Sequence, residues 1–317
     1  MDVTSWCRQC RVLVVAGKGG VGKTTVSAAV GVMAASAGLD VLVVQLEGRG
    51  GVAGLLGYPG DLSYQEAALW STGEGPGRVR GSAVTPDDAL VEYLQTHGLG
   101  KVLYKLLSDG ALEVFAMAAP GIRDVLVLGK VKQLELARAA DLIVVDAPAA
   151  GHALTFLGSA SALADVARVG PIRAQATEVV ELLGDPARCQ VLLVTLPEET
   201  PVNEVIETAG RLQHKLGVTL APLVVNAVFP QLEGLDADPV AEAASQGKRL
   251  VPGHARALAE AAIFRKGRQQ LQDEQLCRLS ERLALPQLHL PQIFSAGIGR
   301  EQVVELAGAL AAAVEAL

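Results

Sequence analysis

The sequence predicts an α/β fold in which helices cover both faces of a doubly wound, mainly parallel β-sheet. Two observations lead to this expectation. A glycine-rich loop at residues 17–24 stands between the apolar run 12–15 and an alanine-rich helical stretch. Further along, short runs of β-branched and leucine residues without polar alternation recur between helical patterns, which is typical of parallel strands buried on both faces.

The glycine-rich loop reads Gly-Lys-Gly-Gly-Val-Gly-Lys-Thr and has the spacing of a phosphate-binding P-loop. Its glycines allow backbone N–H groups to turn toward anionic oxygens, and the following helix N-terminus adds its dipole. Lys23 would reach the β- and γ-phosphates of a nucleotide, and the Thr24 hydroxyl would bind Mg²⁺. A turn that binds nothing would not explain two lysines beside a buried strand. We therefore predict a P-loop NTPase that binds ATP or ADP with Mg²⁺ through Gly17, Lys18, Gly19, Gly20, Val21, Gly22, Lys23, Thr24 and Thr25.

The rest of the chain is interpreted as one P-loop domain of residues 1–317 with a helical subdomain inserted at 57–140. That segment has no convincing strand, and Thr85 followed by Pro86 is a good helix start. The subdomain either binds a partner or simply covers the sheet. Beyond the first apolar run, candidate strands span 41–46, 142–146, 191–196, 223–228 and 288–290, and the last two helices are expected at 254–283 and 300–317.

Composition limits the classes of partner. The net charge of −7 and the pI near 5.3 argue against nucleic acid as a main partner. The chain lacks a run of about 18 uncharged apolar residues, and its first ten residues are too polar for a signal peptide. A cytoplasmic protein without stable membrane insertion is the expectation.

A second motif with chemical meaning is the strand that ends at Asp146. In P-loop NTPases an aspartate at this place lies beside the P-loop threonine and holds Mg²⁺, usually through water. The residues after it, 149–152, would form a loop that senses the γ-phosphate. His152 in that loop is otherwise an ordinary loop histidine.

Cys7 and Cys10 form a Cys-x-x-Cys, but they precede the first strand instead of opening a helix that would lower a thiol pKa. They are interpreted as two incidental thiols, with a metal clip shared by two subunits as the alternative.

Together these motifs resemble the signature-lysine class of P-loop ATPases, which includes the ArsA arsenite-pump ATPase, the guided-entry ATPase for tail-anchored proteins, and the MinD/ParA proteins. The resemblance implies that Lys18 reaches across a dimer to the partner's nucleotide. Segments 146–152, 196–207 and 224–230 are similar to motifs of the ArsA/guided-entry branch. They imply that Asn226 binds the adenine base, and we also assign Pro291 to the nucleotide contacts.

Two further segments, 45–57 and 119–133, look like the bacterial and especially actinobacterial members of that branch, which also occur as paired paralogues. The resemblance thus implies a homodimer or a heterodimer with a paralogous ATPase. It also places Glu47 where the branch usually has an aspartate that orients the attacking water. Because the longer side chain moves the carboxylate, slow hydrolysis is one hypothesis. Alternatively, Glu47 faces solvent or pairs with Arg49.

The resemblance gives less guidance about the client. Residues 57–140 contain no cysteine, which makes an arsenite-pump role unlikely, and the chain has only three methionines to line a groove. The expected function is a dimeric ATPase whose hydrolysis moves a helical subdomain that binds a hydrophobic client or a partner. The alternatives are a weakly active, regulatory half of a heterodimer and a positioning ATPase. Candidate groove residues, which are otherwise core, are Leu90, Leu94, Leu103, Leu106, Val114 and Phe115.

Overall fold

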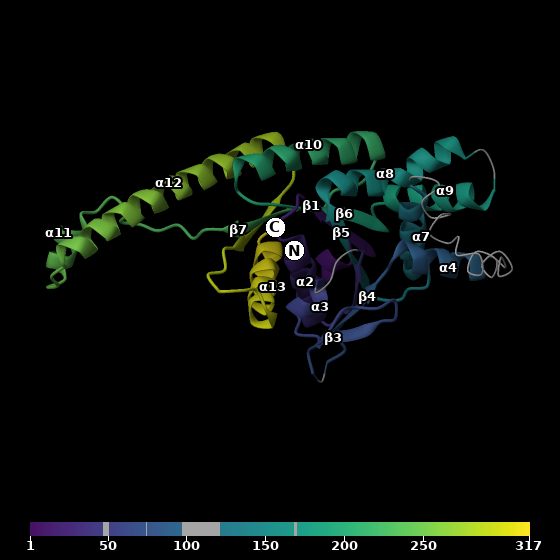
Figure 1. The fold of residues 1–317 in the computed structure, drawn as a ribbon, viewed down its shortest axis with the longest axis horizontal. Helices are drawn as coiled ribbons and strands as arrows, with labels where there is room; N and C mark the ends of the chain where they lie inside the picture. The colour runs from purple at the N-terminus through teal and green to yellow at the C-terminus, as the bar shows by residue number, and fades with distance from the viewer. Residues whose placement is uncertain (47–50, 74, 97–120, 168–169) are drawn as a thin grey trace.

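The structure, a computed structural model, describes residues 1–46, 51–73, 75–96, 121–167 and 170–317. Figure 1 shows a sheet between two layers of helices and a long helical projection to one side.

Among the described residues the sheet has eight strands in the order β3-β4-β2-β5-β1-β6-β7-β8. All neighbouring pairs are parallel except β3 and β4, which pair antiparallel at one edge. The P-loop strand lies near the middle, between β5 and β6. The strands are β1 Val12–Gly17, β2 Asp40–Gln45, β3 Ala67–Ser71, β4 Arg78–Ala83, β5 Leu142–Ala149, β6 Cys189–Thr195, β7 Leu223–Val228 and β8 Gln287–Pro291.

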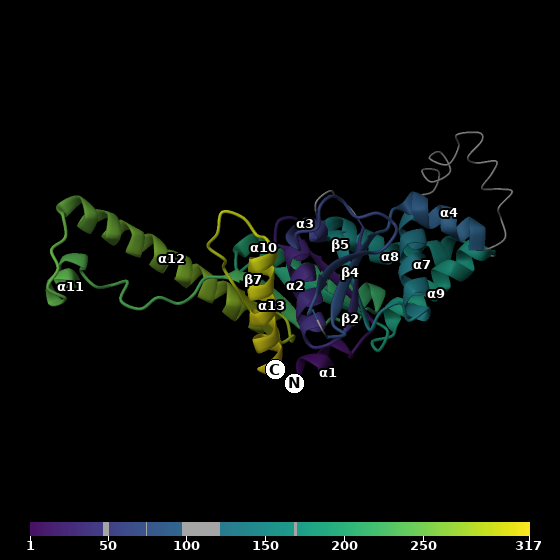
Figure 2. The ribbon, with the colours of Figure 1, turned by 90° about the horizontal axis from the view of Figure 1, so that it is seen from below.

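The helices divide between the two faces and the projection. One face is covered by α1 Val3–Cys7, α2 Lys23–Ser36, α3 Gly51–Leu55 and α13 Arg300–Glu315. The other face is covered by α4 Pro86–Thr96, α7 Ile122–Leu136, α8 Ala150–Val166, α9 Pro171–Gly184 and α10 Glu199–Leu216. The projection consists of α11 Pro239–Ser245 and the outer part of α12 Pro252–Arg282 (Figure 2).

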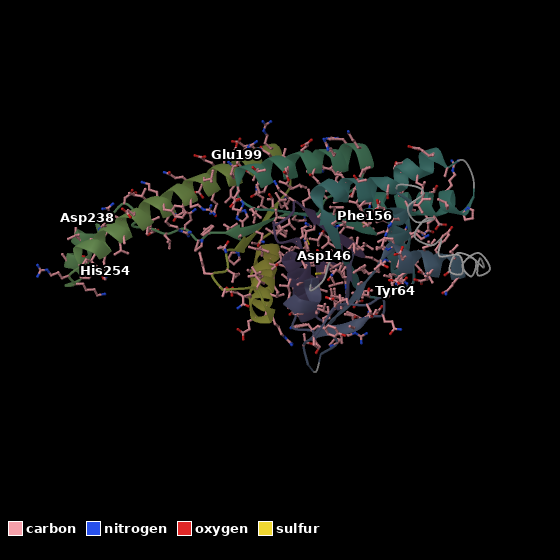
Figure 3. All side chains as sticks on the ribbon, viewed as in Figure 1. Tyr64, Asp146, Phe156, Glu199, Asp238 and His254 are labelled. Atoms are coloured by element: carbon pink, nitrogen blue, oxygen red, sulfur yellow. The ribbon has the colours of Figure 1, made fainter. Side chains whose placement is uncertain are left out.

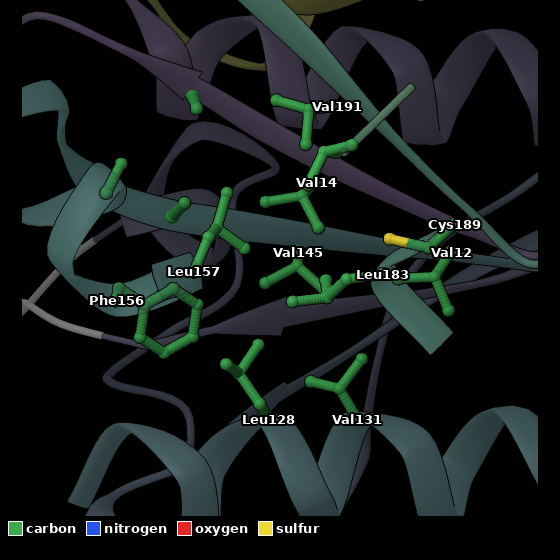
Figure 4. Packing of buried hydrophobic residues seen from close by; sticks show 14 of the residues in the cluster. Val12, Val14, Leu128, Val131, Val145, Phe156, Leu157, Leu183, Cys189 and Val191 are labelled. Atoms are coloured by element: carbon green, nitrogen blue, oxygen red, sulfur yellow. The ribbon is translucent and has the colours of Figure 1, made fainter. Parts of the chain in front are cut away.

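The central strands are buried on both sides because their side chains alternate between two apolar clusters. Val14 of β1, Val145 of β5 and Val191 of β6 pack in one cluster with Leu128 of α7 and Phe156 of α8 (Figure 4). Their sequence neighbours belong to the cluster under α2 and α13. This explains why the strands read as continuous apolar runs, and the predicted α/β architecture is confirmed.

The expectation that residues 57–140 contain no strand is wrong. Strands β3 and β4 lie in this segment and extend the sheet beyond β2. β3 is the edge strand, and β4 reads Arg-Val-Arg-Gly-Ser-Ala, so polar and small residues stand where the central strands have an apolar run. Such strands lack the apolar run that identified the buried ones. Arg80 of β4 pairs with Asp40 of β2, which holds this edge by charge as well as by backbone.

The other expected elements form within a few residues of their predicted limits. The Thr85 Oγ1 accepts a hydrogen bond of 3.2 Å from the Asp88 N–H at the start of α4, as the sequence predicted. Leu90 and Leu94 are only 2% and 5% exposed, so the suggestion that they line an open groove is wrong, and they are core residues. The remaining groove candidates, Leu103, Leu106, Val114 and Phe115, lie outside the described residues. In the described part of the chain, no helix has the length and apolar character needed to cross a membrane.

Candidate active site

The P-loop joins the end of β1 to the start of α2 at the carboxyl edge of the parallel sheet. Gly20 and Gly22 have φ angles of 85° and 89°, in the left-handed region that favours glycine. Gly22 is also the N-cap of α2. The loop therefore depends on glycine at these two positions to turn directly into the helix, where free N–H groups face outward.

At two glycines of the loop, neighbouring atoms leave no space for a side chain. A Cβ atom on Gly22 would lie 2.4 Å from Nδ2 of Asn226, and a Cβ on Gly17 would lie 2.4 Å from the carbonyl oxygen of Val194. The side chain of Lys23 folds back, and its Nζ donates a hydrogen bond of 3.1 Å to the carbonyl oxygen of Lys18. A phosphate oxygen could replace the carbonyl oxygen of Lys18 as the partner of the Lys23 ammonium, so this loop conformation is compatible with phosphate binding.

Asp146 lies directly beside α2, since β5 pairs with β1 so that Asp146 is level with Val15. Its Oδ2 accepts a hydrogen bond of 2.9 Å from Thr24 Oγ1, and its Oδ1 accepts one of 3.0 Å from Ser27 Oγ. Burial raises the pKa of Asp146, although the hydroxyls of Thr24 and Ser27 and the charge of Lys23 oppose the rise. A hydroxyl and a carboxylate in contact are ligand types that Mg²⁺ prefers, so these residues fit the ion.

Lys18 points to its own chain. Its Nζ lies 2.8 Å from Oε1 of Glu204, which projects from the second turn of α10. The two side chains are 36% and 41% exposed. The ammonium is therefore at the surface of the loop, held by one carboxylate that solvent also reaches.

Asn226 lies within β7, and Pro291 ends the neighbouring strand β8. Asn226 Nδ2 donates a hydrogen bond of 2.9 Å to the carbonyl oxygen of Val21 in the P-loop. The next residue, Ala227, has a φ of 57°, and the register between β7 and β8 shifts there so that Val228 pairs with Pro291. Asn226 thus braces the loop, and its predicted contact with adenine stays a prediction, as does that of Pro291.

Some predicted site residues cannot be placed. Glu47 lies outside the described residues. The expectation of a loop at 149–152 is wrong, because Ala149 ends β5 and α8 begins directly at Ala150, and only the side chains of these residues, including His152, are outside the described structure. Burial raises the pKa of Cys7 and Cys10 to about 12, so both are protonated thiols at neutral pH. Among the residues that are described, no group of three or more histidine, cysteine or acidic side chains is arranged to hold a metal ion.

Sequence reasoning missed three residues at the site. Ser27 could have been found, because it lies one helical turn after Thr24 and so on the same face of α2. Gln45 ends β2 level with Asp146, and its Oε1 accepts a hydrogen bond of 3.2 Å from the N–H of Val52. Glu204 lies in the segment 196–207, which is similar to a motif of the ArsA/guided-entry branch, but its position in the sequence does not indicate Lys18 as its partner.

A glycine-rich loop joins a central strand to a helix, and an aspartate from the neighbouring strand of the sheet accepts a hydrogen bond from the loop's threonine. This combination defines a P-loop nucleotide-binding protein. The model of the anion-transporting ATPase family matches residues 10–48. The chain is 38% identical to the ATPase BagA of Mycobacterium tuberculosis over 240 residues, which cover 73% of this chain and 69% of BagA. The chain therefore belongs to the ArsA family of anion-transporting ATPases and is itself a nucleotide-binding ATPase.

Similarity extends to larger family members. A protein of Halobacterium salinarum named as a putative arsenical pump-driving ATPase is 27% identical over 241 residues, which cover 70% of this chain and 36% of that protein. The arsenical pump-driving ATPase of Escherichia coli is 28% identical over 210 residues, covering 64% of this chain and 32% of the relative. The chain thus spans about a third of these two relatives.

Proposed function

We propose that the protein is a dimeric, Mg²⁺-dependent ATPase that binds ATP between two subunits and uses its hydrolysis to move a partner-binding or client-binding surface. The observation that carries this proposal is the position of Lys18. Its ammonium lies at the outer surface of the P-loop, and among the described residues its ion-pair partner is the half-exposed carboxylate of Glu204. An ammonium with this exposure supports the proposal that Lys18 exchanges Glu204 for the phosphates of a nucleotide in a second subunit.

The other roles follow from the contacts at the site. The loop N–H groups and Lys23 would bind the phosphates, and Thr24 and Asp146 would hold the ion. When bound there, Mg²⁺ neutralises charge on the phosphate oxygens. The exchange at Lys18 costs little, because an exposed ion pair contributes about 0.2–1 kcal/mol. ATP would close the dimer only as far as it binds the closed form better than the open one.

The test is Lys18→Ala, with Lys215→Ala as the control because Lys215 is an exposed lysine at the end of α10. We expect calorimetry to find nearly unchanged ATP binding in Lys18→Ala, while sedimentation detects no nucleotide-dependent dimer and hydrolysis is lost. The control should behave as wild type. Full turnover by Lys18→Ala would refute the role in the second subunit.

A second candidate function, the regulatory half of a heterodimer with a paralogous ATPase, is favoured by the glutamate at position 47. If Glu47 orients the attacking water, single-turnover hydrolysis by Glu47→Gln should be much slower than wild type. An unchanged rate would remove Glu47 from catalysis. If the wild-type chain alone is nearly inactive and a paralogous chain restores turnover, the regulatory function is the correct one.

Coupling to a client would pass from β5 into α8, which follows Asp146 and packs against α7, α9 and α10. Loss of the γ-phosphate beside residues 149–152 would shift this helix and with it the helical layer. Recovery of apolar peptides with a nucleotide-trapped variant, but not with the nucleotide-free chain, supports a chaperone-like role. We do not propose arsenite as a ligand, since residues 57–140 contain no thiol.

A further inference from the structure

β7 is distorted at the point where it lies beside the P-loop. It pairs with β8 from Leu223 to Val225, the register then shifts, and the pairing resumes at Val228. Within this shift Ala227 has a φ of 57°, in the left-handed region that a residue with a Cβ atom rarely adopts. Strain of this kind persists only where the surrounding structure holds it, and it is frequent at ligand sites. The residue before it, Asn226, is therefore the candidate for a further role in nucleotide binding.

The side-chain amide of Asn226 contacts two adjacent residues of the P-loop. Its Nδ2 donates a hydrogen bond of 2.9 Å to the carbonyl oxygen of Val21. The same nitrogen lies so close to Gly22 that a Cβ atom there would be 2.4 Å away. Gly22 is the N-cap of α2 and directly precedes Lys23. The amide therefore fixes the turn from which Lys23 and the N–H groups of the first helical turn project.

The chain that follows Asn226 is held from its other side by α12. It runs outward to Asp238 and His254, which lie at the far end of the molecule, and α12 then returns to the body (Figure 3). There the buried amide of Gln272 accepts a hydrogen bond of 2.7 Å from the N–H of Phe229 and donates one of 3.2 Å to its carbonyl oxygen. Because both backbone groups of Phe229 are bonded to one side chain, its position is fixed relative to α12.

The strand β8 adds a contact at the same place. The N–H of Gln292, the residue after β8, donates a hydrogen bond of 2.9 Å to the carbonyl oxygen of Val228. Residues 226–229 are thus held at one end by the P-loop and at the other by β8 and α12. The strained Ala227 lies between the two sets of contacts, so both sets maintain its left-handed conformation.

We propose that Asn226 is a positioning residue for the P-loop: it acts on the triphosphate of a nucleotide through the loop and not through the base. A glycine-rich loop loses much backbone freedom when it is ordered, and a loop that is already ordered binds its ligand at lower cost. Since all nucleoside triphosphates share the triphosphate, the contribution of Asn226 should be independent of the base. A hydrogen bond from Asn226 to adenine, which the family resemblance implies, predicts the opposite. The inference rests on the phosphate site of the proposed function and requires no dimer.

The test compares ATP with CTP, which carries the same ribose triphosphate on a pyrimidine. Calorimetry with Mg²⁺ measures ATP binding directly and CTP binding by competition. In Asn226→Ala both affinities should fall by about three- to tenfold, the contribution of one hydrogen bond, and their ratio should stay as in wild type. Asn203→Ala is the matched control, because it changes the only other asparagine of the chain, an exposed residue of α10 that accepts a hydrogen bond from Arg278. It should leave both affinities unchanged.

Asn226→Asp tests the hydrogen bond without a change of shape. It replaces the Nδ2 donor by an oxygen that would face the carbonyl oxygen of Val21. Both ATP and CTP should therefore bind to it at least as weakly as to Asn226→Ala. Circular dichroism verifies that every variant is folded at the temperature of the calorimetry.

A double variant tests the contact with Gly22. The added Cβ of Gly22→Ala would collide with Nδ2 of Asn226, and removal of the asparagine side chain relieves that collision. The factor by which Gly22→Ala lowers ATP affinity should therefore be at least about twofold smaller in the Asn226→Ala background than in wild type. Equal factors in the two backgrounds would overturn the inferred contact.

Other results would also overturn the inference. A loss of affinity confined to ATP would assign the amide to the base. Unchanged affinities in Asn226→Ala, or an ATP affinity that Asn226→Asp retains, would mean that the loop does not depend on this residue. In each of these cases the phosphate site of the proposed function would stand. If wild type instead binds neither nucleotide, that phosphate site is itself refuted, and the role of Asn226 is refuted with it.

Discussion

Lys18 and Glu204 form an ion pair of 2.8 Å that joins the P-loop to α10 within one chain. Both side chains are more than a third exposed, so the pair is weak and easily exchanged. Glu204 is therefore the partner of the ammonium that the proposed dimer requires, and in that dimer it would compete with the nucleotide of the second subunit for Lys18.

Replacing Glu204 should favour the closed dimer. In Glu204→Gln the ammonium of Lys18 loses its competing carboxylate, and we expect the ATP-dependent dimer to tighten by up to about fivefold for each Lys18 exchanged, the equivalent of one exposed ion pair. Sedimentation with a non-hydrolysable ATP analogue measures the change. Glu207→Gln, which breaks the exposed pair with Arg211 on the same helix, is the matched control. A weaker dimer in Glu204→Gln would mean that the carboxylate itself contacts the partner.

Asp146 should lower the stability of the nucleotide-free chain, although it is proposed to hold Mg²⁺ when nucleotide is bound. Because burial raises its folded-state pKa above the ordinary 3.8, the stability that its protonated form contributes is lost as the pH rises from 3.8 through the folded-state pKa. Asp146→Asn should therefore melt at a higher temperature than wild type at pH 7 without nucleotide. It should also lose most of the increase in melting temperature that Mg²⁺ and ATP give. Ser27→Ala, which keeps the carboxylate, should retain that increase. A variant that melts lower and still responds to Mg²⁺ would contradict the assignment.

The parts of the fold that the sequence predicted are those buried on both faces. Strands such as Leu223–Val228 are mostly apolar, and the P-loop motif itself predicts the strand before it and the helix after it. Strands β3 and β4 were missed because an edge of the sheet leaves polar side chains such as Arg78 and Arg80 in the strand. No local pattern distinguishes such a strand from a polar loop.

The site was predictable to the extent that its chemistry is local. Lys23 and Thr24 belong to one motif, and the apolar strand before Asp146 indicated that carboxylate. The partners of Lys18 and Asn226 were not predictable, because Glu204 and Val21 come close only through the packing of α10 and the register of β7. The projection formed by α11 and the outer part of α12 was predicted only as a long helix. A sequence pattern does not show whether such a helix packs on the body of the protein or extends away from it.

Glycine at position 22 should be indispensable, for two separate reasons. Its φ of 89° disfavours a side chain, and a Cβ would lie 2.4 Å from Nδ2 of Asn226. Gly22→Ala should cost about 1–3 kcal/mol of folding stability and move Asn226 from the loop. ATP affinity measured by calorimetry should fall by about tenfold or more, since about 1.4 kcal/mol corresponds to a factor of ten. Gly210→Ala, in α10 with no atom within 4 Å of the added carbon, should instead be neutral or stabilising. Unchanged affinity in Gly22→Ala would show that the loop adapts.

Glu135 should stabilise the amino-terminal ends of the central strands β1 and β6 in a pH-dependent way. Its buried carboxylate accepts hydrogen bonds of 2.9 Å from Arg11 Nε and 2.7 Å from Arg188 Nη2, which joins α7 to the residues just before β1 and β6. Burial alone would raise its pKa, but the hydrogen bonds from Arg188 and Arg11 lower the pKa overall. The stability it contributes is then complete above the ordinary value of 4.5 and is lost as the pH falls through the folded-state pKa.

Urea unfolding of Glu135→Gln should therefore give a deficit of about 2–4 kcal/mol at pH 7, less than for a fully buried pair because both arginines keep some hydration. The deficit should shrink below pH 4.5, where wild type loses the same charge. Glu260→Gln, which removes an exposed pair with Arg256, should change stability by less than about 0.5 kcal/mol at either pH. A deficit for Glu135→Gln that stays constant with pH would mean that its shape, and not its charge, supports the β1 and β6 strands.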